Sequence, residues 1–486
     1  MNLNPYIYSQ NLMQKAEMET FKKEDSFLVM QKAAKTCFNF IIDIDSNQRI
    51  LVVCGPGNNG GDGILIAKYL YDKQKNVELY APLGMAKTDD SSKALALLNS
   101  SFPIKQSVNL EDYDIIIDSV FGVGLSRPIT KELQILFQDL NDSRARVISI
   151  DMPSGVQTDT GQVDSVAIKA DTTLTFHRLK PGHLLLPGKE YAGTIKLLDI
   201  QLENLDNQTK IFLNTPPPIK KINNADHKYS RGTSYIIAGT QLIGASKLAA
   251  LAASQSSLRS GAGLSKLLIA KTNQEVFKPH LLEEMMMLYD NQKKLFEIIQ
   301  KTKITSLIFG CGIDINQDNL ELLRFLLDQP INLVLDASAF SLIEQDKPAC
   351  FDALYKREAT TILTPHKGEF EKVFENTNDK INDCINAAKQ TNSIILYKGS
   401  DTVIGTPSCK AYLNHSSSPH LATAGSGDVL AGLIGGLLAQ EYKGVEATKL
   451  ACYIHSQCGI RLGRGLIASD LIKEISKVLI NLDSNN

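Results

Sequence analysis

Short apolar runs rich in branched residues recur along this chain of 486 residues, and stretches with helical periodicity separate them. The runs in the first half cover residues 49–54, 77–80, 114–118 and 146–151. Those in the second half cover residues 266–269, 306–309, 331–335, 361–363, 393–397 and 401–404. Strands that alternate with helices form parallel sheets that are buried on both faces. The pattern therefore predicts an α/β fold in which ligands bind beyond the carboxyl ends of the strands.

The composition is that of a folded protein without a strongly charged surface. Hydrophobic residues make up 43% of the chain and charged residues 21%, which is enough to build more than one core. The net charge of −2 gives no field that would attract a nucleic acid or an anionic membrane. No secretory signal is visible, and no apolar run approaches the roughly 18 residues of a membrane-spanning helix. The 8 cysteines show no CxxC or zinc-site spacing, so we expect free thiols and a cytoplasmic protein with no nucleic-acid or membrane partner.

Three consecutive prolines, residues 216–218, interrupt the pattern near the middle of the chain. Such a run forms neither a helix nor a central strand, which predicts a linker at residues 214–221. We expect an N-terminal domain over residues 1–214 and a C-terminal domain over residues 222–486.

A glycine-rich loop follows the first predicted strand. Gly55, Gly57 and Gly60 have the GxGxxG spacing of dinucleotide-binding loops, and a helical pattern follows from residue 64. An NAD-dependent dehydrogenase is the obvious alternative for this half, but two features argue against it. Asp62 stands where the helix is expected to begin, and a carboxylate there competes with a phosphate for backbone N–H groups. The second strand also ends without the acid that binds a ribose hydroxyl in dehydrogenases.

Oxygen-bearing side chains gather at the predicted carboxyl ends of the same strands. They belong to residues 58–62, Asp118, Asp151 and Ser154, and hard cations prefer such ligands. Each of them alone is equally compatible with a helix cap or a turn. A second glycine-containing loop, residues 122–128, carries an arginine that could meet a phosphate or lie on the surface. The first half therefore offers a candidate ion-binding site, with ordinary turn residues as the alternative.

The loop at residues 423–428, Thr-Ala-Gly-Ser-Gly-Asp, is the strongest motif of the second half. Its small residues let backbone N–H groups point at one oxyanion, and an Ala/Gly/Leu helix is expected directly after it. Charge that develops on a transferring phosphoryl group would be stabilised there. Asp428 could accept a proton from a substrate hydroxyl. The alternative is a glycine-rich turn with an aspartate cap.

Other phosphate-binding candidates lie at predicted strand ends. Residues 239–246 have the glycine spacing of a Walker A loop, but Ala245 replaces its lysine. Residues 398–402 offer a lysine, a close-approach glycine and hydroxyl groups, and Gly312 follows another strand. His366 also follows a predicted strand, although a lone histidine is more often structural.

The C-terminal set resembles the ribokinase-like superfamily, and more closely its NAD(P)HX dehydratase branch. The matching residues are His227, Lys228, Gly244, Ala245, 259–263, 364–366, Lys398, Gly399 and 425–432. The N-terminal set resembles the NAD(P)HX epimerase domain at residues 54–63, 118–128 and 151–155. The fusion in this order resembles the bifunctional NAD(P)HX repair enzymes of bacteria. The resemblance implies an N-terminal Rossmann-like three-layer αβα sandwich and a C-terminal ribokinase-like αβα domain.

The same resemblance implies the chemistry. The substrates are NADHX and NADPHX, which are NADH and NADPH hydrated at C6 of the nicotinamide ring. The epimerase domain, with K⁺, interconverts their R and S forms. The dehydratase domain removes water from the S form at the expense of ADP, with Mg²⁺, and releases AMP and phosphate. A homo-oligomer is expected.

The site residues that the resemblance implies fall into five groups. The catalytic candidates are Asp428, which would deprotonate the C6 hydroxyl so that it attacks the β-phosphate of ADP, and Asp151. Epimerase contacts with the substrate are Asn58, Asn59, Gly60, Gly61, Asp62, Gly122, Val123, Gly124, Leu125, Ser126, Arg127, Pro128 and Asp151. Dehydratase contacts with the substrate are Ala245, Gly312, His366 and Asp428. Contacts with ADP are Lys398, Gly399, Ser400, Asp401, Thr402 and Gly427. Potassium ligands are Asn59, Asp118 and Ser154.

Two other functions stay open at this point. The first is a ribokinase-like kinase for a small vitamin precursor with an extra N-terminal Rossmann-like domain, which predicts a stable phosphorylated product. The second is a non-catalytic nucleotide-binding or regulatory protein, which predicts that Asp428→Asn leaves function unchanged. The chain also departs from the patterns of the two resembled domains at residues 30–34 and 238–240.

Overall fold

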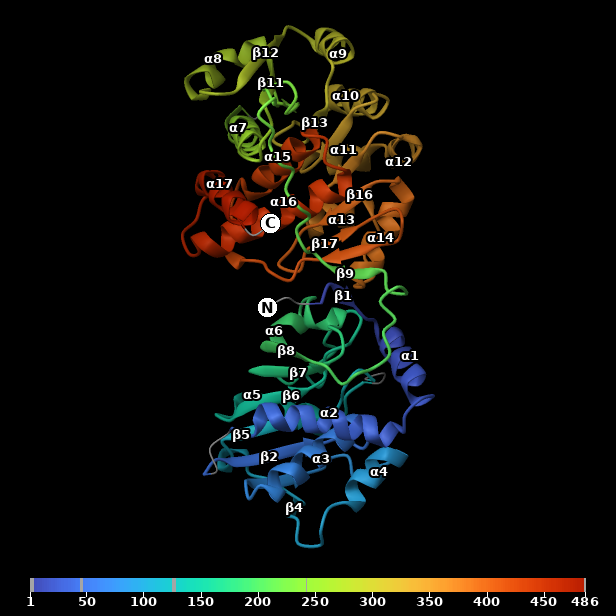
Figure 1. The fold of residues 1–486 in the computed structure, drawn as a ribbon. Coiled ribbons are helices and arrows are strands. Elements are labelled where there is room, and N and C mark those ends of the chain that lie inside the picture. The colour runs from blue at the N-terminus through green and yellow to red at the C-terminus, as the bar shows by residue number, and fades with distance from the viewer. Residues whose placement is uncertain (1–3, 44–46, 125–127, 242, 485–486) are drawn as a thin grey trace. The chain divides into compact units, whose positions relative to one another are not determined.

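The computed structural model describes residues 4–43, 47–124, 128–241 and 243–484, and the chain forms two compact units, Met1–Ile211 and Phe212–Asn486 (Figure 1). Each unit is built around its own largely parallel sheet, which confirms the predicted α/β class with two domains. The proline run expected to form the linker lies just inside the second unit. Among the helices in the described ranges, none is long and apolar enough to cross a membrane.

The first unit is a doubly wound α/β fold. Its strands are β1 (Tyr6–Ile7), β2 (Arg49–Cys54), β3 (Asn76–Tyr80), β4 (Ile104–Lys105), β5 (Ile115–Ser119), β6 (Arg146–Ile150), β7 (Thr172–Phe176) and β8 (Thr194–Leu198). Its helices are α1 (Gln10–Phe21), α2 (Ser26–Ile41), α3 (Asn58–Asp72), α4 (Asp89–Ala96), α5 (Lys131–Asp142) and α6 (Gly188–Tyr191). The sheet has the order β4-β3-β2-β5-β6-β7-β8, and its neighbouring strands are parallel.

Alternate residues of strand β2 enter different cores, which explains why helices cover both faces of this sheet. Ile50 and Val52 pack with residues of α1, α2 and α3, whereas Leu51 and Val53 pack with residues of α5. Successive side chains of a strand point to opposite faces, so a continuous apolar run needs cover on both sides. The three-layer arrangement predicted for this half is therefore present.

Helix α3 begins at Asn58, well before residue 64, where we expected its start. The predicted glycine-rich loop over residues 55–63 is thus mostly helix. Gly60 permits this, because a Cβ at this position would lie 1.7 Å from the carbonyl oxygen of Gly55. Close packing of the helix on the preceding loop outweighs the low helix propensity of glycine. Residues 58–62 consequently lie in the first turns of a helix at the carboxyl edge of the sheet.

The second unit has a larger sheet. Its strands are β9 (Ile211–Leu213, which starts at the boundary), β10 (Thr233–Ile237), β11 (Leu264–Ala270), β12 (Met285–Tyr289), β13 (Ser306–Phe309), β14 (Asn332–Leu335), β15 (Thr361–Leu363), β16 (Ile394–Tyr397), β17 (Val403–Gly405) and β18 (Ala411–Leu413). Its helices are α7 (Ile243–Arg259), α8 (Gln274–Phe277), α9 (Gln292–Lys301), α10 (Gln317–Leu327), α11 (Ser338–Gln345), α12 (Lys347–Lys356), α13 (Lys367–Val373), α14 (Lys380–Thr391), α15 (Ser426–Ala439), α16 (Gly444–Leu462) and α17 (Ala468–Ser484). From β18 onward the order is β18-β17-β16-β15-β14-β13-β10-β11-β12.

Strands β10 to β16 of this unit all run parallel to their neighbours in the sheet, but β17 departs from the prediction. The apolar run at residues 401–404 contributes to β17, which is antiparallel to β16. Only residues 398–402 join these two strands, and such a connection is too short for the crossover that a parallel pair requires. The carboxyl ends of β13, β14, β15 and β16 therefore lie at one edge of the sheet. After β16 the chain reverses direction and forms β17.

Helix α15 packs on the sheet of the second unit in the same layer as α7 and α16. Ile308 and Val334 pack in one core with residues of α7, α15, α16 and α17. Their neighbours Leu307 and Leu333 are equally buried, so the opposite face of the sheet is also covered. The second unit therefore has three layers, and the N-terminus of α15 is brought to the sheet edge where the parallel strands end.

Candidate active sites

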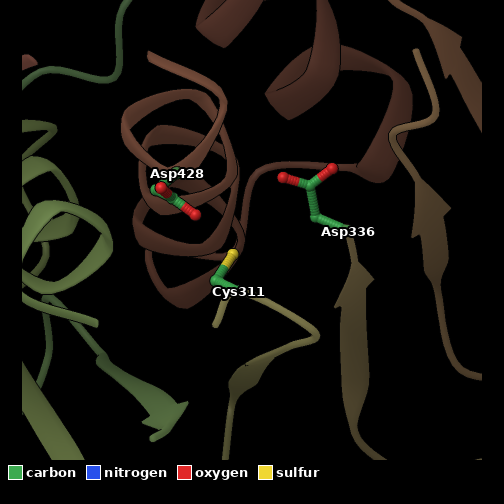
Figure 2. Close-up of side chains that lie close together, drawn as sticks. All are labelled: Cys311, Asp336 and Asp428. Atoms are coloured by element: carbon green, nitrogen blue, oxygen red, sulfur yellow. The ribbon is translucent and has the colours of Figure 1, made fainter. Parts of the chain in front are cut away.

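Four neighbouring parallel strands of the second unit end in residues that can carry chemistry. Cys311, Asp336, His366 and Lys398 follow β13, β14, β15 and β16 in that order. Asp428 reaches the same edge from the first turn of α15. Ligand atoms of Cys311, Asp336 and Asp428 all lie within 4.8 Å of one another (Figure 2).

An ion pair joins two of these strand ends. Lys398 Nζ lies 2.7 Å from Asp336 Oδ1 and 3.5 Å from Glu369 Oε2. The Thr364 hydroxyl donates a further hydrogen bond of 2.9 Å to Asp336 Oδ1. Burial lowers the pKa of Lys398, but attraction to Asp336 and Glu369 outweighs burial and raises it. The ammonium group is therefore both positioned and charged, as contact with a phosphate chain requires.

Asp428 has the properties of a proton acceptor near neutral pH. Burial, followed by repulsion from Asp336, raises its pKa to about 6. The Cys311 thiol donates a hydrogen bond to the Asp428 carboxylate, and burial raises the pKa of that thiol well above its usual value. The thiol thus stays protonated, while a carboxylate with this pKa is ionised at pH 7 and still basic enough to take up a proton.

Asp336 and Glu369 are functional candidates that sequence analysis missed. Asp336 directly follows the predicted strand at residues 331–335, and the reasoning that singled out Asp118 and Asp151 at strand ends could have found it. Glu369 has no such signal, because its role depends on the position of Lys398. Their carboxylate oxygens are the ligands that Mg²⁺ prefers, whereas a protonated thiol is a poor ligand for this ion.

A cavity of about 680 Å³ adjoins this cluster. Of the residues predicted to contact ADP, those that line the cavity are Lys398, Gly399, Ser400, Thr402 and Gly427. Asp401 is not part of the lining, because it is buried in an ion pair with Lys380. The lining also contains the hydroxyl group of Thr423, from the motif at residues 423–428, and those of Ser417 and Ser418, which had no signal in the sequence.

The residues predicted to contact the substrate of this unit lie in two places. His366 lines the cavity and caps α13, where its Nδ1 accepts a hydrogen bond of 3.2 Å from the N–H of Glu369. Gly312 packs against the start of α7, so that a Cβ on it would lie 3.2 Å from the carbonyl carbon of Ala245. The start of α7 therefore packs on the same loop whose Cys311 thiol contacts Asp428.

The first unit has a cavity of about 510 Å³ at the carboxyl ends of β2, β5 and β6. Of the residues predicted to contact the epimerase substrate, those that line it are Asn58, Asn59, Asp62, Gly122, Val123, Gly124 and Asp151. Gly60 and Gly61 are buried in the packing of α3 instead, and Pro128 is exposed outside the lining. Outside the described residues are Leu125, Ser126 and Arg127. Glu17 of α1 also lines this cavity and was missed, because a lone glutamate in a polar helix carries no signal.

Asp118 and Ser154 lie together under this cavity. The Ser154 hydroxyl donates a hydrogen bond of 2.6 Å to Asp118 Oδ1, and its N–H donates one of 2.9 Å to Oδ2. The Ser149 hydroxyl donates another of 2.7 Å to Oδ2. Burial raises the pKa of Asp118, although these hydrogen bonds oppose the effect.

Asn59, the third predicted potassium ligand, has an unsatisfied side chain. Its Oδ1 and Nδ2 are buried without a hydrogen-bond partner. The Ser119 hydroxyl donates to the Asn59 carbonyl oxygen, so Asn59 adjoins the strand end that carries Asp118. Buried polar atoms normally have partners. An unpaired amide oxygen on a residue that adjoins this strand end therefore fits a cation with oxygen ligands.

Asp151 follows β6 and forms an ion pair with a fully buried lysine. Lys180 Nζ lies 2.5 Å from Asp151 Oδ1, and it also donates to the Thr175 hydroxyl at 2.8 Å and to the Phe176 carbonyl at 3.1 Å. Burial raises the pKa of Asp151, but attraction to Lys180 is stronger and the pKa falls below its usual value. Sequence analysis missed Lys180 because the threonine-rich strand before it, β7, was not predicted.

Comparisons with known proteins cover both units. Residues 234–481 match the family model for NAD(P)H-hydrate dehydratase, and residues 26–182 match that for the YjeF-related protein N-terminus. The chain is 31% identical to the bifunctional NAD(P)H-hydrate repair enzyme Nnr of Thermofilum pendens, over 84% of this chain and 82% of that one. It is 32% identical to the enzyme of the same name from Dictyoglomus turgidum, over 92% of each chain. The solved ADP/ATP-dependent NAD(P)H-hydrate dehydratase from Bacillus subtilis is 25% identical, with a TM-score of 0.47, over 55% of this chain and 95% of that one.

The fold and the two sites define a two-unit α/β enzyme with a cavity in each unit. The chain belongs to the family of bifunctional NAD(P)H-hydrate repair enzymes. The resemblance noted in the sequence is thereby confirmed.

Proposed function

We propose that this chain repairs hydrated nicotinamide nucleotides with two activities. The first unit interconverts the R and S forms of NADHX and NADPHX. The second unit dehydrates the S form at the expense of ADP and yields NAD(P)H, AMP and phosphate. The observation that carries the proposal is the position of Asp428, which lies beside the Asp336–Lys398 ion pair and next to a cavity of about 680 Å³.

The dehydration follows from the groups at this edge. Asp428 takes the proton of the C6 hydroxyl, and the hydroxyl oxygen attacks the β-phosphorus of ADP, with AMP as the leaving group. Lys398 and the N–H groups at the start of α15 stabilise the charge on the transferring phosphoryl group. The ring nitrogen then expels phosphate from C6, and loss of a proton from C5 restores the dihydronicotinamide.

The carboxylates of Asp336 and Glu369 fit the Mg²⁺ that accompanies a nucleotide, since they are hard oxygen ligands beside Lys398, which we expect to contact the phosphate chain. When bound, this ion neutralises phosphate charge. In the first unit, Asn59, Asp118 and Ser154 would hold K⁺, and the support for this is the unpaired amide oxygen of Asn59. That ion would fix the loop after β5 against α3.

The test is to incubate the purified chain with NADHX and either ADP or ATP, and to follow recovery of the NADH absorbance band. We expect recovery with a nucleotide and none without it, together with stoichiometric release of phosphate. A stable phosphorylated product without recovery would instead support the vitamin-precursor kinase. If NADH absorbance recovers with neither nucleotide, the proposed dehydratase activity is wrong.

A further inference from the structure

Three carboxyl groups from separate elements face one cavity in the first unit. Glu17 comes from α1, Asp62 from α3 and Asp151 from the loop after β6, and all three line the cavity of about 510 Å³. Lys180 lies beneath them, with no exposed surface. Nothing in the family matches or in the motifs assigns a role to Glu17 or Lys180.

Lys180 forms an ion pair with only one of the three carboxyl groups, that of Asp151. Lys180 Nζ lies 2.5 Å from Asp151 Oδ1, and its other contacts are the neutral oxygens of Thr175 and Phe176. A buried ammonium group needs a partner of opposite charge, so this pair keeps Asp151 ionised. Glu17 and Asp62, by contrast, have no ion-pair partner within the described ranges of the chain.

The backbone of Asp151 is also held in a demanding conformation. Its φ is 67°, in the left-handed region that non-glycine residues rarely adopt. His183 Nδ1 accepts a hydrogen bond of 3.1 Å from the N–H of Lys180, so the ring hydrogen lies on Nε2, which donates to the Asp151 carbonyl at 3.0 Å. Strained residues that are fixed by several contacts concentrate at functional sites. Lys180 and His183 together fix the position of the Asp151 carboxylate.

The three carboxyl groups that line this cavity therefore differ in their protonation states. Burial, followed by repulsion from Asp151, raises the pKa of Glu17 to about 7. Burial, followed by repulsion from Asp151 and Glu17, raises the pKa of Asp62 well above its usual value. The pKa of Asp151 stays below its usual value. Environments that separate the pKa values of two carboxyl groups are characteristic of an acid and a base that act together.

We propose that Glu17 and Asp151 are opposing proton carriers in the epimerisation, and that Lys180 is a positioning residue that keeps Asp151 in its base form. This inference rests on the proposed function of the first unit. It adds a second catalytic side chain, from a helix that no motif covers.

The step that we infer conserves atoms and electrons. Glu17 donates its proton to the C6 hydroxyl, the C6–O bond breaks, and water leaves with the bonding pair. The lone pair of the ring nitrogen forms a double bond to C6, which becomes planar. Water adds to the other face of C6, and Asp151 accepts the proton of that water. The proton then returns from Asp151 to Glu17 through solvent, and no redox change occurs.

The test uses the full chain and its own second unit as an internal control. In the variant Glu17→Gln, conversion of the R form to the S form is measured by chromatography without nucleotide, and the spontaneous rate is subtracted. ADP-dependent recovery of NADH from the purified S form is measured in parallel. We expect the conversion to fall at least about 100-fold, the low end of an acid–base contribution, while recovery from the S form stays unchanged. Conversion within twofold of the wild-type rate overturns the inference about Glu17.

This design separates two kinds of failure. If the wild-type chain does not convert the R form at all, the proposed epimerase function is wrong. If the wild type converts it and Glu17→Gln does so equally well, only the inference is wrong. The variant Glu17→Asp keeps the acid and should retain more activity than Glu17→Gln, which distinguishes proton transfer from a structural effect on α1.

Lys180 is tested through the pH profile rather than through the rate alone. The charged and titratable groups that act on Asp151 are Lys180, His183, Glu17, Asp62 and Cys37. Removal of the ammonium group in Lys180→Met raises the pKa of Asp151, so the acidic limb of the conversion rate should move to higher pH by about one unit or more. Thr175→Val, which removes one hydrogen bond from the same carboxylate, should move it in the same direction by less. An unmoved limb in both variants overturns the role of Lys180.

Discussion

At the N-terminus of α15, Asp428 is half-buried beside a second carboxylate, Asp336, and its pKa rises to about 6. A solvent-exposed aspartate has a pKa of about 3.9 and is a weak base at neutral pH. The same side chain thus becomes a useful base through its neighbours. Lys398, which pairs with Asp336, limits the rise and keeps Asp428 ionised at pH 7.

We expect Asp428→Asn to lower ADP-dependent recovery of NADH at least about 100-fold, because an amide of the same size cannot accept the hydroxyl proton. In the wild type the rate should fall as the pH decreases below about 6, since protonation removes the base. Initial rates across this range, at saturating nucleotide, measure both effects. The control is conversion of the R form to the S form, which the variant should retain. A wild-type rate that is constant through pH 6 would contradict the role of Asp428.

At the level of the helices and strands, the packing of α15 on α7 determines where the carboxylate of Asp428 lies. A Cβ on Gly432 of α15 would lie 2.2 Å from the carbonyl oxygen of Ala253 in α7, and one on Gly436 would lie 2.5 Å from that of Ser257. Only glycine allows the helices to approach this closely. Asp428 stands in the first turn of the same helix, so this contact also positions its carboxylate.

We expect Gly432→Ala to destabilise the second unit by about 1–3 kcal/mol, the usual cost of overpacking a core. The matched control is Gly244→Ala in α7, an exposed position where a Cβ would meet no heavy atom within 4 Å. Urea unfolding followed by circular dichroism measures the free energy of unfolding of each variant. Equal stability of the two variants would show that the glycine contact does not determine this packing.

The strands were predictable where an apolar run dominates, and not elsewhere. Strands β13 and β15 have the predicted bounds, Ser306–Phe309 and Thr361–Leu363. The central strand β10, Thr233–Ile237, was missed because it opens with a threonine and a serine, and β7, Thr172–Phe176, because threonines interrupt its apolar pattern. Each of them pairs with a strand on both sides in its sheet. This tertiary pairing stabilises them, and their local sequence does not predict it.

For the chain as a whole, the main feature is that each unit has a cavity of its own. The cavity of the first unit is lined by residues between Gln14 and Phe176, and that of the second by residues between His366 and Ser456. Among the described residues, those that line each cavity belong to one unit. The two activities therefore need to share only the hydrated nucleotide itself.

We expect that an equimolar mixture of Asp428→Asn and Asp151→Asn chains repairs the R form at a rate approaching that of the wild type. The first variant supplies S form from its intact first unit, and the second dehydrates that product after it diffuses through solution. NADH absorbance from pure R form with ADP measures the recovery, and each variant alone is the control. A mixture no faster than either variant alone would indicate that the hydrate passes between units of one chain.

The alternation of strands and helices was contained in the sequence by itself, because the periodicity of apolar residues records which faces must be buried. That pattern placed Asp118, Asp151, His366 and Lys398 at strand ends and Asp428 at the start of a helix. Only the tertiary structure decided the partners, Lys180 for Asp151 and Asp336 for Lys398. Such pairs join residues far apart in the chain, and they depend on strand order and burial, which no local pattern encodes. The pKa values that make a carboxyl group an acid or a base arise from the same burial and neighbours.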